Sequence, residues 1–341
     1  MQTIESVSPA ILVEPGDDGT EHASIHSEIS TGHRATTNNA VSYAVVVTSY
    51  NYRDFVIEAI ESILAQTLAP EQIIVVDDGS SDGSAALLHG HYAGNERVTL
   101  LIGKNEGQLG AFQRGVALVR ADVVCFLDSD DCWEPEYLAR LDALYASRPD
   151  IDFVFSDLQL FDQQDRVMKF HHVAVDLGYT AISTYILTQW YGAPTSALSM
   201  RTAWAQRALD LPELFQGTWR LSADNCLVFG CSILGAHKYY LPTGCVKYRI
   251  HGKNGWWSNQ SARKEYVNKM TSSALIRHYA AKVGLAPECV EFAKLEFMTK
   301  PRPTWSETKR YARLVQMRRL SPWRRWERAL SILGRGLKLR G

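Results

Sequence analysis

Short apolar segments that end in polar residues recur along the first half of the chain, and they constrain its fold more than any other feature. The segments YAVVVTSYN, QIIVVDDGS and ADVVCFLDSDD begin at residues 43, 72 and 121, and VTLLIG at 98–103 is a further strand pattern. Apolar residues at helical spacing separate them, as at Val56, Ala59, Ile60 and Ile63. This alternation predicts an α/β fold with a doubly wound, mostly parallel sheet.

Three polar clusters follow these strands, at residues 48–51, 77–79 and 128–131. Ligands of doubly wound sheets bind beyond the carboxyl ends of the strands. We therefore expect the three clusters to line one crevice. The usual phosphate-binding loops are missing, because the chain has no GxGxxG and its HGKNG segment lacks the P-loop spacing. A dinucleotide oxidoreductase and a P-loop NTPase are disfavoured.

The FLDSDD segment at 126–131 places three carboxylates at the end of a strand that is predicted to be buried. Like charges this close repel one another unless a positive charge lies between them. Oxygen ligands from Asp128 and Asp130 suit Mg²⁺ or Mn²⁺. Acids at strand ends also cap turns, and Asp131 is a candidate cap for the helix that starts near Pro135.

The two ends of the chain differ in charge. Residues 1–42 hold six acids and one base without sustained periodicity, so we expect an acidic, disordered leader. Residues 300–341 hold thirteen bases and two acids, within a tail at 261–341 that is expected to be helical. No signal peptide and no apolar run long enough to span a bilayer is recognisable, which favours a cytoplasmic location. The six cysteines lack metal-ligand spacing, so we expect reduced thiols and no zinc.

Four segments together resemble a known family. VVVTSYNYRDFVIEAIESILAQT, IIVVDDGSSDGS, KNEGQLGAFQRG and CFLDSDDCWEP occur in the order and spacing of the family 2 glycosyltransferases, over about residues 43–255. The resemblance implies a GT-A fold with a D-x-D motif, and an enzyme of the type that builds bacterial cell-surface polysaccharides. It divides the domain at 43–260 into a nucleotide-sugar half (43–150) and an acceptor half (151–260).

The resemblance also implies donor-binding residues. Thr48, Ser49 and Tyr50 match the motif that packs around the base of the nucleotide, with the tyrosine ring available for stacking. Asp78 matches the position that hydrogen-bonds the base, while Asp77 before it is either a ligand residue or a turn cap.

Asn105 and Gly107 match the loop over the donor. Phe112 occupies a position that is often arginine in the family, which leaves Arg114 as the candidate phosphate or sugar contact. Within the D-x-D motif, Asp128 and Asp130 match the metal ligands, with Asp130 as the direct one. Ser129 between them belongs to the expected donor-binding set.

In the acceptor half, Asp224 of SADNCL resembles the catalytic aspartate of the family, although an acid at a helix start is also favoured by the helix dipole. His251 resembles a histidine that some relatives use near the metal, and its alternative is a surface hydrogen-bonding role. Trp256 and Trp257 could stack on sugar rings or pack a domain edge.

The predicted reaction is a single displacement that inverts the anomeric carbon, because no second carboxylate is identifiable as a nucleophile. Asp224 accepts the acceptor's proton, and Mg²⁺ or Mn²⁺ neutralises the leaving diphosphate. The expected donor is a UDP-, GDP- or dTDP-sugar, and the acceptor a glycan or a lipid-linked glycan. A sugar-nucleotide nucleotidyltransferase and a catalytically silent nucleotide-sugar-binding module remain alternatives.

The basic tail at 309–340 interleaves arginine with Leu, Trp, Ile and Val. This composition is typical of helices that lie in an anionic membrane interface, so we expect peripheral attachment to the inner face of the plasma membrane. A basic helix that packs on its own domain is the alternative. Nucleic acid is not expected as a partner, because the tail carries no recognised binding module.

Overall fold

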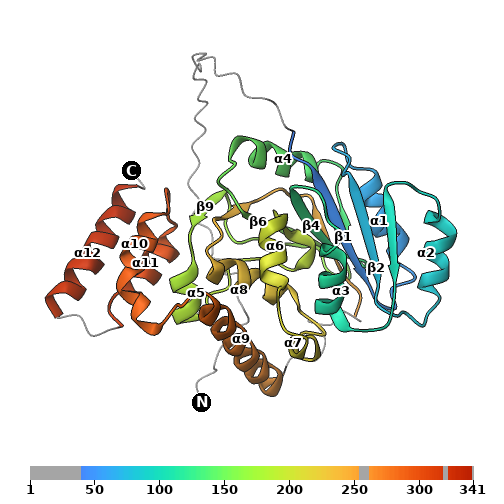
Figure 1. Ribbon diagram of the computed structural model, residues 1–341. Coiled ribbons are helices and arrows are strands. Elements are labelled where there is room, and N and C mark those ends of the chain that lie inside the picture. The colour runs from blue at the N-terminus through green and yellow to red at the C-terminus, as the bar shows by residue number, and fades with distance from the viewer. Residues whose placement is uncertain (1–39, 253–260, 318–321, 340–341) are drawn as a thin grey trace, which may run out of the picture.

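The computed structural model describes residues 40–252, 261–317 and 322–339 (Figure 1). Residues 1–39, most of the expected leader, lie outside the described residues, as do Trp256 and Trp257. The described part is an α/β structure followed by a helical C-terminal part, as the sequence predicts.

Strands and helices alternate through the first half of the chain. The strand nearest its start is buried along its whole length, and the helix after it buries Val56, Ala59, Ile60 and Ile63. In chain order the elements are β1 (Tyr43–Ser49), α1 (Val56–Leu64), β2 (Gln72–Asp77), α2 (Ser84–Tyr92), β3 (Val98–Ile102), α3 (Gly107–Val116), β4 (Val123–Asp128), β5 (Cys132–Trp133) and α4 (Tyr137–Ser147).

The second half has shorter strands and a series of helices. It contains β6 (Phe153–Ser156), β7 (Leu158–Asp162), β8 (Arg166–Met168), β9 (Val175–Gly178), α5 (Ala181–Leu187), the 3-10 helix η1 (Thr195–Ala197), β10 (Leu198–Arg201), α6 (Thr202–Leu209), α7 (Leu214–Thr218), α8 (Asp224–Leu234), β11 (Lys238–Leu241) and β12 (Val246–Ile250). The C-terminal part contains α9 (Ala262–Lys282), the 3-10 helix η2 (Pro287–Phe292), α10 (Ala293–Met298), α11 (Trp305–Leu314) and α12 (Pro322–Lys338).

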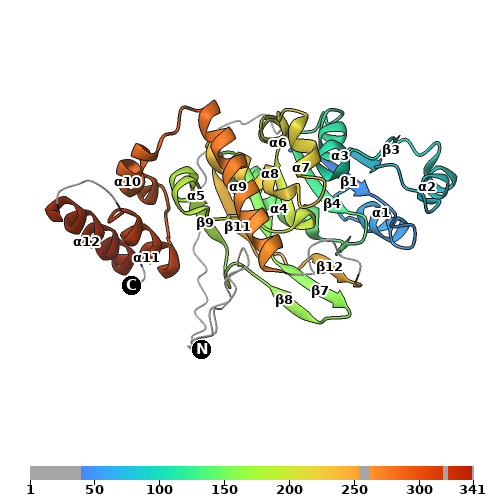
Figure 2. The same ribbon diagram turned by 90° about the horizontal axis from the view of Figure 1, so that it is seen from below.

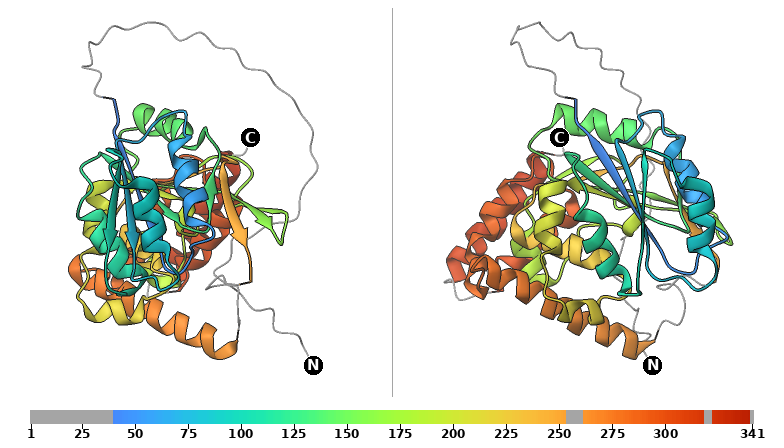
Figure 3. Two further views of the ribbon diagram at one scale, coloured as in Figure 1. Left: turned by 90° about the vertical axis from the view of Figure 1, so that its right-hand side faces the viewer. Right: turned by 45° about the vertical axis from the view of Figure 1, so that its right-hand side comes forward.

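One large sheet organises the molecule, with strand order β3-β2-β1-β4-β10-β6-β11-β9. The first four strands are parallel, and β10 runs antiparallel to both of its neighbours. Helices flank this sheet on both of its faces (Figure 3). Because β1 lies between β2 and β4, the chain reverses direction across the sheet at β1, and ligands bind at such a switch point.

A second, smaller sheet has the order β5-β12-β7-β8 and lies to one side of the large one (Figure 2). Strand β12 pairs with β5, which follows the D-x-D segment directly in the chain. The pairing therefore brings the end of β12, which is far away in the sequence, next to residues 128–131.

The described residues form two apolar cores. Helix α9 packs against α8, and its Leu275, Ile276 and Tyr279 belong to the main core. Helices α10, α11 and α12 form a second core with Ile182 of α5. They lie at the opposite end of the molecule from α1 and α2 (Figure 1). Helix α9 therefore belongs to the main core, and the second core is built mainly from residues that follow it. The domain boundary expected at residue 260 lies before α9.

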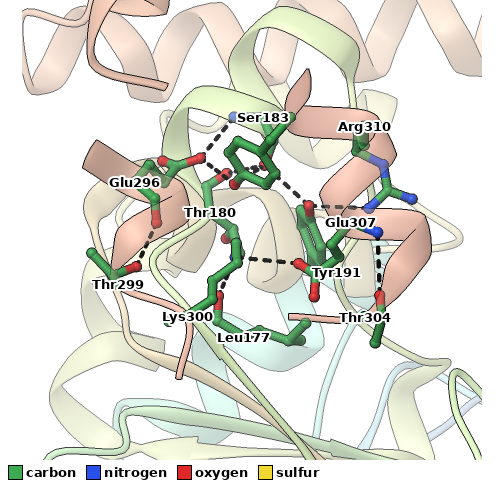
Figure 4. Close-up of polar contacts among 12 residues, drawn as sticks. Leu177, Thr180, Ser183, Tyr191, Glu296, Thr299, Lys300, Thr304, Glu307 and Arg310 are labelled. Carbon is green, nitrogen blue, oxygen red and sulfur yellow. Dashed lines mark hydrogen bonds and ion pairs between the residues drawn. The ribbon is translucent and has the colours of Figure 1, made fainter. Parts of the chain in front are cut away.

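Buried polar contacts fasten the C-terminal helices to the body (Figure 4). The Glu296 carboxylate accepts hydrogen bonds from the backbone N–H groups of Ile182 at 2.7 Å and Ser183 at 3.0 Å. Lys300 and Glu307 are both fully buried and form an ion pair at 3.3 Å. The first contact satisfies N–H groups at the start of α5, which have no partners within the helix itself.

Candidate active site

The ends of β1 and β4 place Thr48 beside Asp128. The two residues are opposite each other in the parallel register, and the Thr48 hydroxyl donates to Asp128 Oδ1 at 3.2 Å. The Asp128 backbone N–H donates to the Ser196 hydroxyl of η1 at 3.1 Å. Polar groups from separate strand ends therefore meet at one place.

The carboxylates of the D-x-D segment lie close enough together to perturb one another. Burial and the negative charges of Asp130 and Asp224 raise the pKa of Asp128 to about 7. Burial and the same motif's acids raise the pKa of Asp131 well above its usual value. A cation bound here would reverse this repulsion and favour the ionised forms.

The structure brings His251 to Asp130. His251 follows the last residue of β12, and its Nε2 lies 2.9 Å from Asp130 Oδ2. The imidazole also packs against the rings of Tyr52 and Phe55, with centroid separations of 5.5 and 5.0 Å. Two of the three predicted metal ligands are therefore in direct contact.

The carboxylate oxygens of Asp128 and Asp130 have the chemistry that a hard divalent cation needs, and the imidazole of His251 adds a softer nitrogen donor. Within residues 40–252, 261–317 and 322–339, no three His, Cys, Asp or Glu side chains are grouped closely enough to hold a metal by themselves. A cation here would need further ligands from a bound substrate.

Arg249 of β12 holds the D-x-D segment through hydrogen bonds, and the sequence does not predict this role. Its Nε donates to the backbone carbonyl of Asp130 at 2.8 Å, and its backbone N–H donates to Asp131 Oδ1 at 2.8 Å. The Ser196 hydroxyl donates to the other oxygen of Asp131. The prediction that Asp131 caps the helix near Pro135 is therefore wrong, because its carboxylate binds β12 and η1 instead.

The guanidinium of Arg249 is enclosed by other groups. It pairs with Glu58 at 2.5 Å and Asp162 at 3.2 Å, and it lies over the rings of Phe55 and Phe161. The only feature of the sequence that points to a role for Arg249 is its place in a predicted strand, two positions before His251. Arg249 lies within β12 and His251 directly follows it, and both side chains contact Asp130.

Asp78 follows the last residue of β2 and contacts the loop before α3. Its carboxylate accepts from the backbone N–H groups of Glu106 at 3.0 Å and Gly107 at 2.8 Å. Arg114 pairs with the same carboxylate at 2.7 Å and with Glu106 at 3.3 Å. Asp78 and Arg114 thus shape the loop before α3, and their expected contacts with the base and the phosphate or sugar remain predictions.

The loop before α3 is packed against the segment that leads into α8. Gly107 has φ +84°, and a Cβ there would lie 2.7 Å from Arg220 Cα, so glycine is required by both its conformation and its surroundings. The Arg220 guanidinium donates to Asn105 Oδ1. Phe112 is fully buried against Phe126, which explains an aromatic residue at the position where arginine is frequent.

The remaining predicted donor residues differ in accessibility. Tyr50 is 48% exposed, so its ring is accessible for stacking on a ligand. The hydroxyls of Ser49 and Ser129 are buried without a hydrogen-bond partner in the described part of the chain. Asp77 accepts from the Ser80 backbone N–H at 3.0 Å, so it does cap the turn after β2.

Asp224 is the first residue of α8. Its Oδ1 accepts from the Asn225 backbone N–H at 2.9 Å, and burial raises its pKa to about 7. Its charge contributes to the raised pKa of Asp128, so the two carboxylates lie within electrostatic range. A carboxylate with a pKa near neutrality is suited to accept a proton.

Gln108 connects the D-x-D motif with the start of α8, and the sequence does not predict a role for it. Its Nε2 donates to Asp128 Oδ1 at 3.1 Å and to Thr195 Oγ1 at 3.3 Å. Its Oε1 accepts from the Ala223 backbone N–H, next to Asp224, at 2.9 Å. One side-chain amide therefore spans from the D-x-D motif to the start of α8.

A doubly wound sheet with paired acids at its switch point, a further carboxylate at the start of α8 and an added small sheet are features of the GT-A class of glycosyltransferases. The model of Glycosyl transferase family 2 matches residues 44–203. An uncharacterized glycosyltransferase of a Nostoc species is 30% identical over 260 residues, which cover 71% of this chain and 79% of the relative. The chain belongs to glycosyltransferase family 2.

Other similarities are more partial. The putative teichuronic acid biosynthesis glycosyltransferase TuaG of Bacillus subtilis is 30% identical over 138 residues, which cover 40% of this chain and 54% of TuaG. The structure of S. aureus TarS 1-349 in complex with UDP has a TM-score of 0.53 at 15% identity and covers 85% of this chain and 79% of that one. The same TarS fragment in complex with UDP-GlcNAc has a TM-score of 0.50 at 13% identity, covering 87% and 81%. These likenesses confirm the predicted fold.

Proposed function

We propose that this protein transfers a sugar from a nucleoside diphosphate donor to an acceptor hydroxyl with inversion of the anomeric carbon. The observation that carries the proposal is the position of Asp224, a carboxylate whose pKa is raised to about 7. Gln108 hydrogen-bonds both the backbone N–H of the preceding residue, Ala223, and Asp128 of the D-x-D segment. This arrangement supplies a proton acceptor at the start of α8 and, at the end of β4, acids suited to a diphosphate-bound cation.

In this proposal Asp224 removes the proton from the acceptor hydroxyl as its oxygen bonds to the anomeric carbon. The bond between that carbon and the diphosphate oxygen breaks at the same time, and the electron pair leaves with the nucleoside diphosphate. A single displacement inverts the configuration. Burial of Asp224 keeps its basicity near that needed at neutral pH.

Asp130 and His251, with Asp128 beside them, are the residues that would hold Mg²⁺ or Mn²⁺, and diphosphate oxygens would complete the coordination. The bound cation would neutralise charge on the leaving group. The contact of 2.9 Å between Asp130 and His251 supports this assignment, as does the electrostatic repulsion around Asp128.

The donor proposed for the first test is a UDP-sugar, since TarS, which shares the fold, was solved with UDP and UDP-GlcNAc. GDP- and dTDP-sugars remain candidates. The proposed acceptor is a glycan or a lipid-linked glycan in the assembly of a surface polysaccharide. The names of TuaG and of the succinoglycan biosynthesis protein ExoO of Rhizobium meliloti place those relatives in such pathways.

A thermal-shift panel of nucleoside diphosphates and nucleotide sugars, with Mn²⁺ and with EDTA, identifies the donor before any acceptor is known. We expect nucleotides with one particular base to raise the Tm of the protein in the presence of Mn²⁺, and we expect EDTA to abolish this rise. Incubation of that donor with candidate acceptors then separates the alternatives by product. A glycosyltransferase releases nucleoside diphosphate, a nucleotidyltransferase releases pyrophosphate, and a silent binding module releases neither.

A further inference from the structure

Helix α12 lies at the outer end of the molecule (Figure 2). It carries an exposed apolar stripe. Trp323, Trp326, Leu330 and Leu337 are 80%, 62%, 62% and 61% exposed. With 3.6 residues per turn, these four positions fall within about 60° of one another around the helix, over a length of about 21 Å. Single exposed apolar residues are normal, but a continuous stripe with two tryptophans marks a contact surface.

A different face of α12 already holds the helix in place. Ala329, Ile332 and Gly336 are buried, and a Cβ at Gly336 would lie 2.4 Å from the Thr308 side chain of α11. Arg328 donates to the Glu291 carbonyl at 2.9 Å. The fold therefore does not need the stripe for its own packing, and it keeps the stripe turned outward.

The preceding helix offers no comparable surface. In α11, Tyr311, Ala312 and Leu314 are buried in the second core, and Val315 after it is buried as well. The expectation that the whole segment 309–340 lies in a membrane interface is therefore too broad, because the apolar residues of α11 are occupied within the protein.

Exposed cations lie on α12 itself and on the neighbouring helix α11. Lys309 and Arg313 of α11 and Arg324 and Lys338 of α12 are exposed. The acid of α12, Glu327, pairs with Lys294 at 3.2 Å. Two copies of this face would repel each other, and a nucleic acid would use the tryptophans and cations but would leave Leu330 and Leu337 in contact with charged backbone. Tryptophan and leucine flanked by Lys and Arg instead match the chemistry of an anionic lipid surface.

We propose that the α12 stripe docks on the interface of an anionic lipid bilayer, with Trp323 and Trp326 at headgroup depth and the flanking cations on the acidic headgroups. The docking involves no residue of the candidate active site. It therefore does not depend on the proposed sugar transfer, and it is tested without donor or acceptor.

The test is flotation of the full-length protein with vesicles of phosphatidylcholine alone and of phosphatidylcholine mixed with phosphatidylglycerol. We expect binding to the anionic vesicles only, weakened by salt because the cationic part is screened. The W323S/W326S variant should bind at least ~10-fold more weakly, since it loses the apolar part of the contact. R313E/R324E should lose the preference for anionic lipid.

L118S/V173S is the matched control, because it also changes two exposed apolar residues to serine, away from α12. It should bind vesicles like the wild type, and circular dichroism should show all variants folded. The proposal is overturned if the wild type floats with neither vesicle, or if W323S/W326S and the control bind equally. It is also overturned if the tryptophan change abolishes self-association in sedimentation analysis, or oligonucleotide binding, while leaving flotation intact.

Discussion

The side-chain amide of Gln108 donates a hydrogen bond to Asp128 Oδ1 at 3.1 Å, and its carbonyl oxygen accepts from the backbone beside Asp224 at 2.9 Å. The distance between the D-x-D motif and the proposed base is thus set by one residue at the start of α3. Gln108 is a positioning residue in this arrangement, because it acts through the carboxylates that it orients.

Replacing Gln108 by leucine should lower kcat about tenfold or more, because a misplaced base raises the barrier by about 1.4 kcal/mol or more. The KM for the donor should change less. Gln113→Leu is the control: Gln113 lies on the same helix but donates to the Leu209 carbonyl at 2.9 Å. Equal effects of the two changes on kcat would show that Gln108 has only a structural role.

Replacing Asp224 by asparagine should leave donor binding nearly unchanged and lower kcat by about 10²- to 10⁴-fold, the usual contribution of a general base. Isothermal titration with the donor and steady-state kinetics measure the two quantities. Turnover at the wild-type rate would refute the assignment of Asp224 as the base.

The pH dependence gives an independent check on Asp224. Its pKa is raised to about 7, so kcat should fall as the pH drops through 7, where the carboxylate becomes protonated, and should level off above it.

The raised pKa of Asp224 also means that ionisation of its carboxylate lowers the stability of the folded state, and this cost grows as the pH rises from the unfolded pKa near 4 towards 7. Asp224→Asn should therefore raise the Tm at pH 8 and leave it nearly unchanged at pH 4. A fall in Tm at pH 8 would contradict the assigned shift.

Replacing Arg249 by lysine should destabilise the protein by about 3 kcal/mol, because the buried hydrogen bond to the Asp130 carbonyl and the partly buried charged one to Glu58 are lost. It should also weaken binding of a nucleotide sugar with Mn²⁺, since the D-x-D segment loses its anchor. Urea unfolding and calorimetry measure the two effects. Lys247→Met on the same strand changes a largely exposed pair with Glu134 and should alter neither quantity by much.

The pair of Lys300 and Glu307 gives a prediction about stability alone. Lys300→Met leaves the Glu307 carboxylate buried without its cation and should cost about 3–5 kcal/mol. K300M/E307L should be more stable than the single variant, because the uncompensated charge is gone. Lys282→Met at the surface pair with Asp210 should cost less than about 1 kcal/mol. A double variant no more stable than the single one would contradict the argument.

Local sequence patterns predict β1 to β4 and most of the helices, because buried strands are continuously apolar and α1 repeats its apolar residues at helical spacing. They do not predict the two-residue strand β5. The turn cap at Asp77 also depends on residues a few positions away, and it is one of the two roles that the sequence predicts for this residue. Asp131 was assigned wrongly for the opposite reason, since its partner Arg249 lies 118 residues further along the chain.

The parts of the site that sequence reasoning missed depend on strand pairing. Arg249 reaches Glu58 across 191 residues, and Gln108 reaches Ala223 across 115, so no local pattern connects them. The tail shows the same limit in a different form. Composition indicates an amphipathic basic segment at 309–340. Only the packing of the helices shows that the apolar residues of α11 are buried in the protein, whereas α12 also has exposed apolar residues.

Glu296 completes the start of a helix that precedes it by more than a hundred residues. During synthesis, α5 therefore leaves the ribosome long before Glu296 has been added to the chain. Until then, the N–H groups of Ile182 and Ser183 lack the carboxylate that accepts their hydrogen bonds. Nascent chains arrested before α10 should keep this region open to protease, and resistance should appear only after the last helices have emerged.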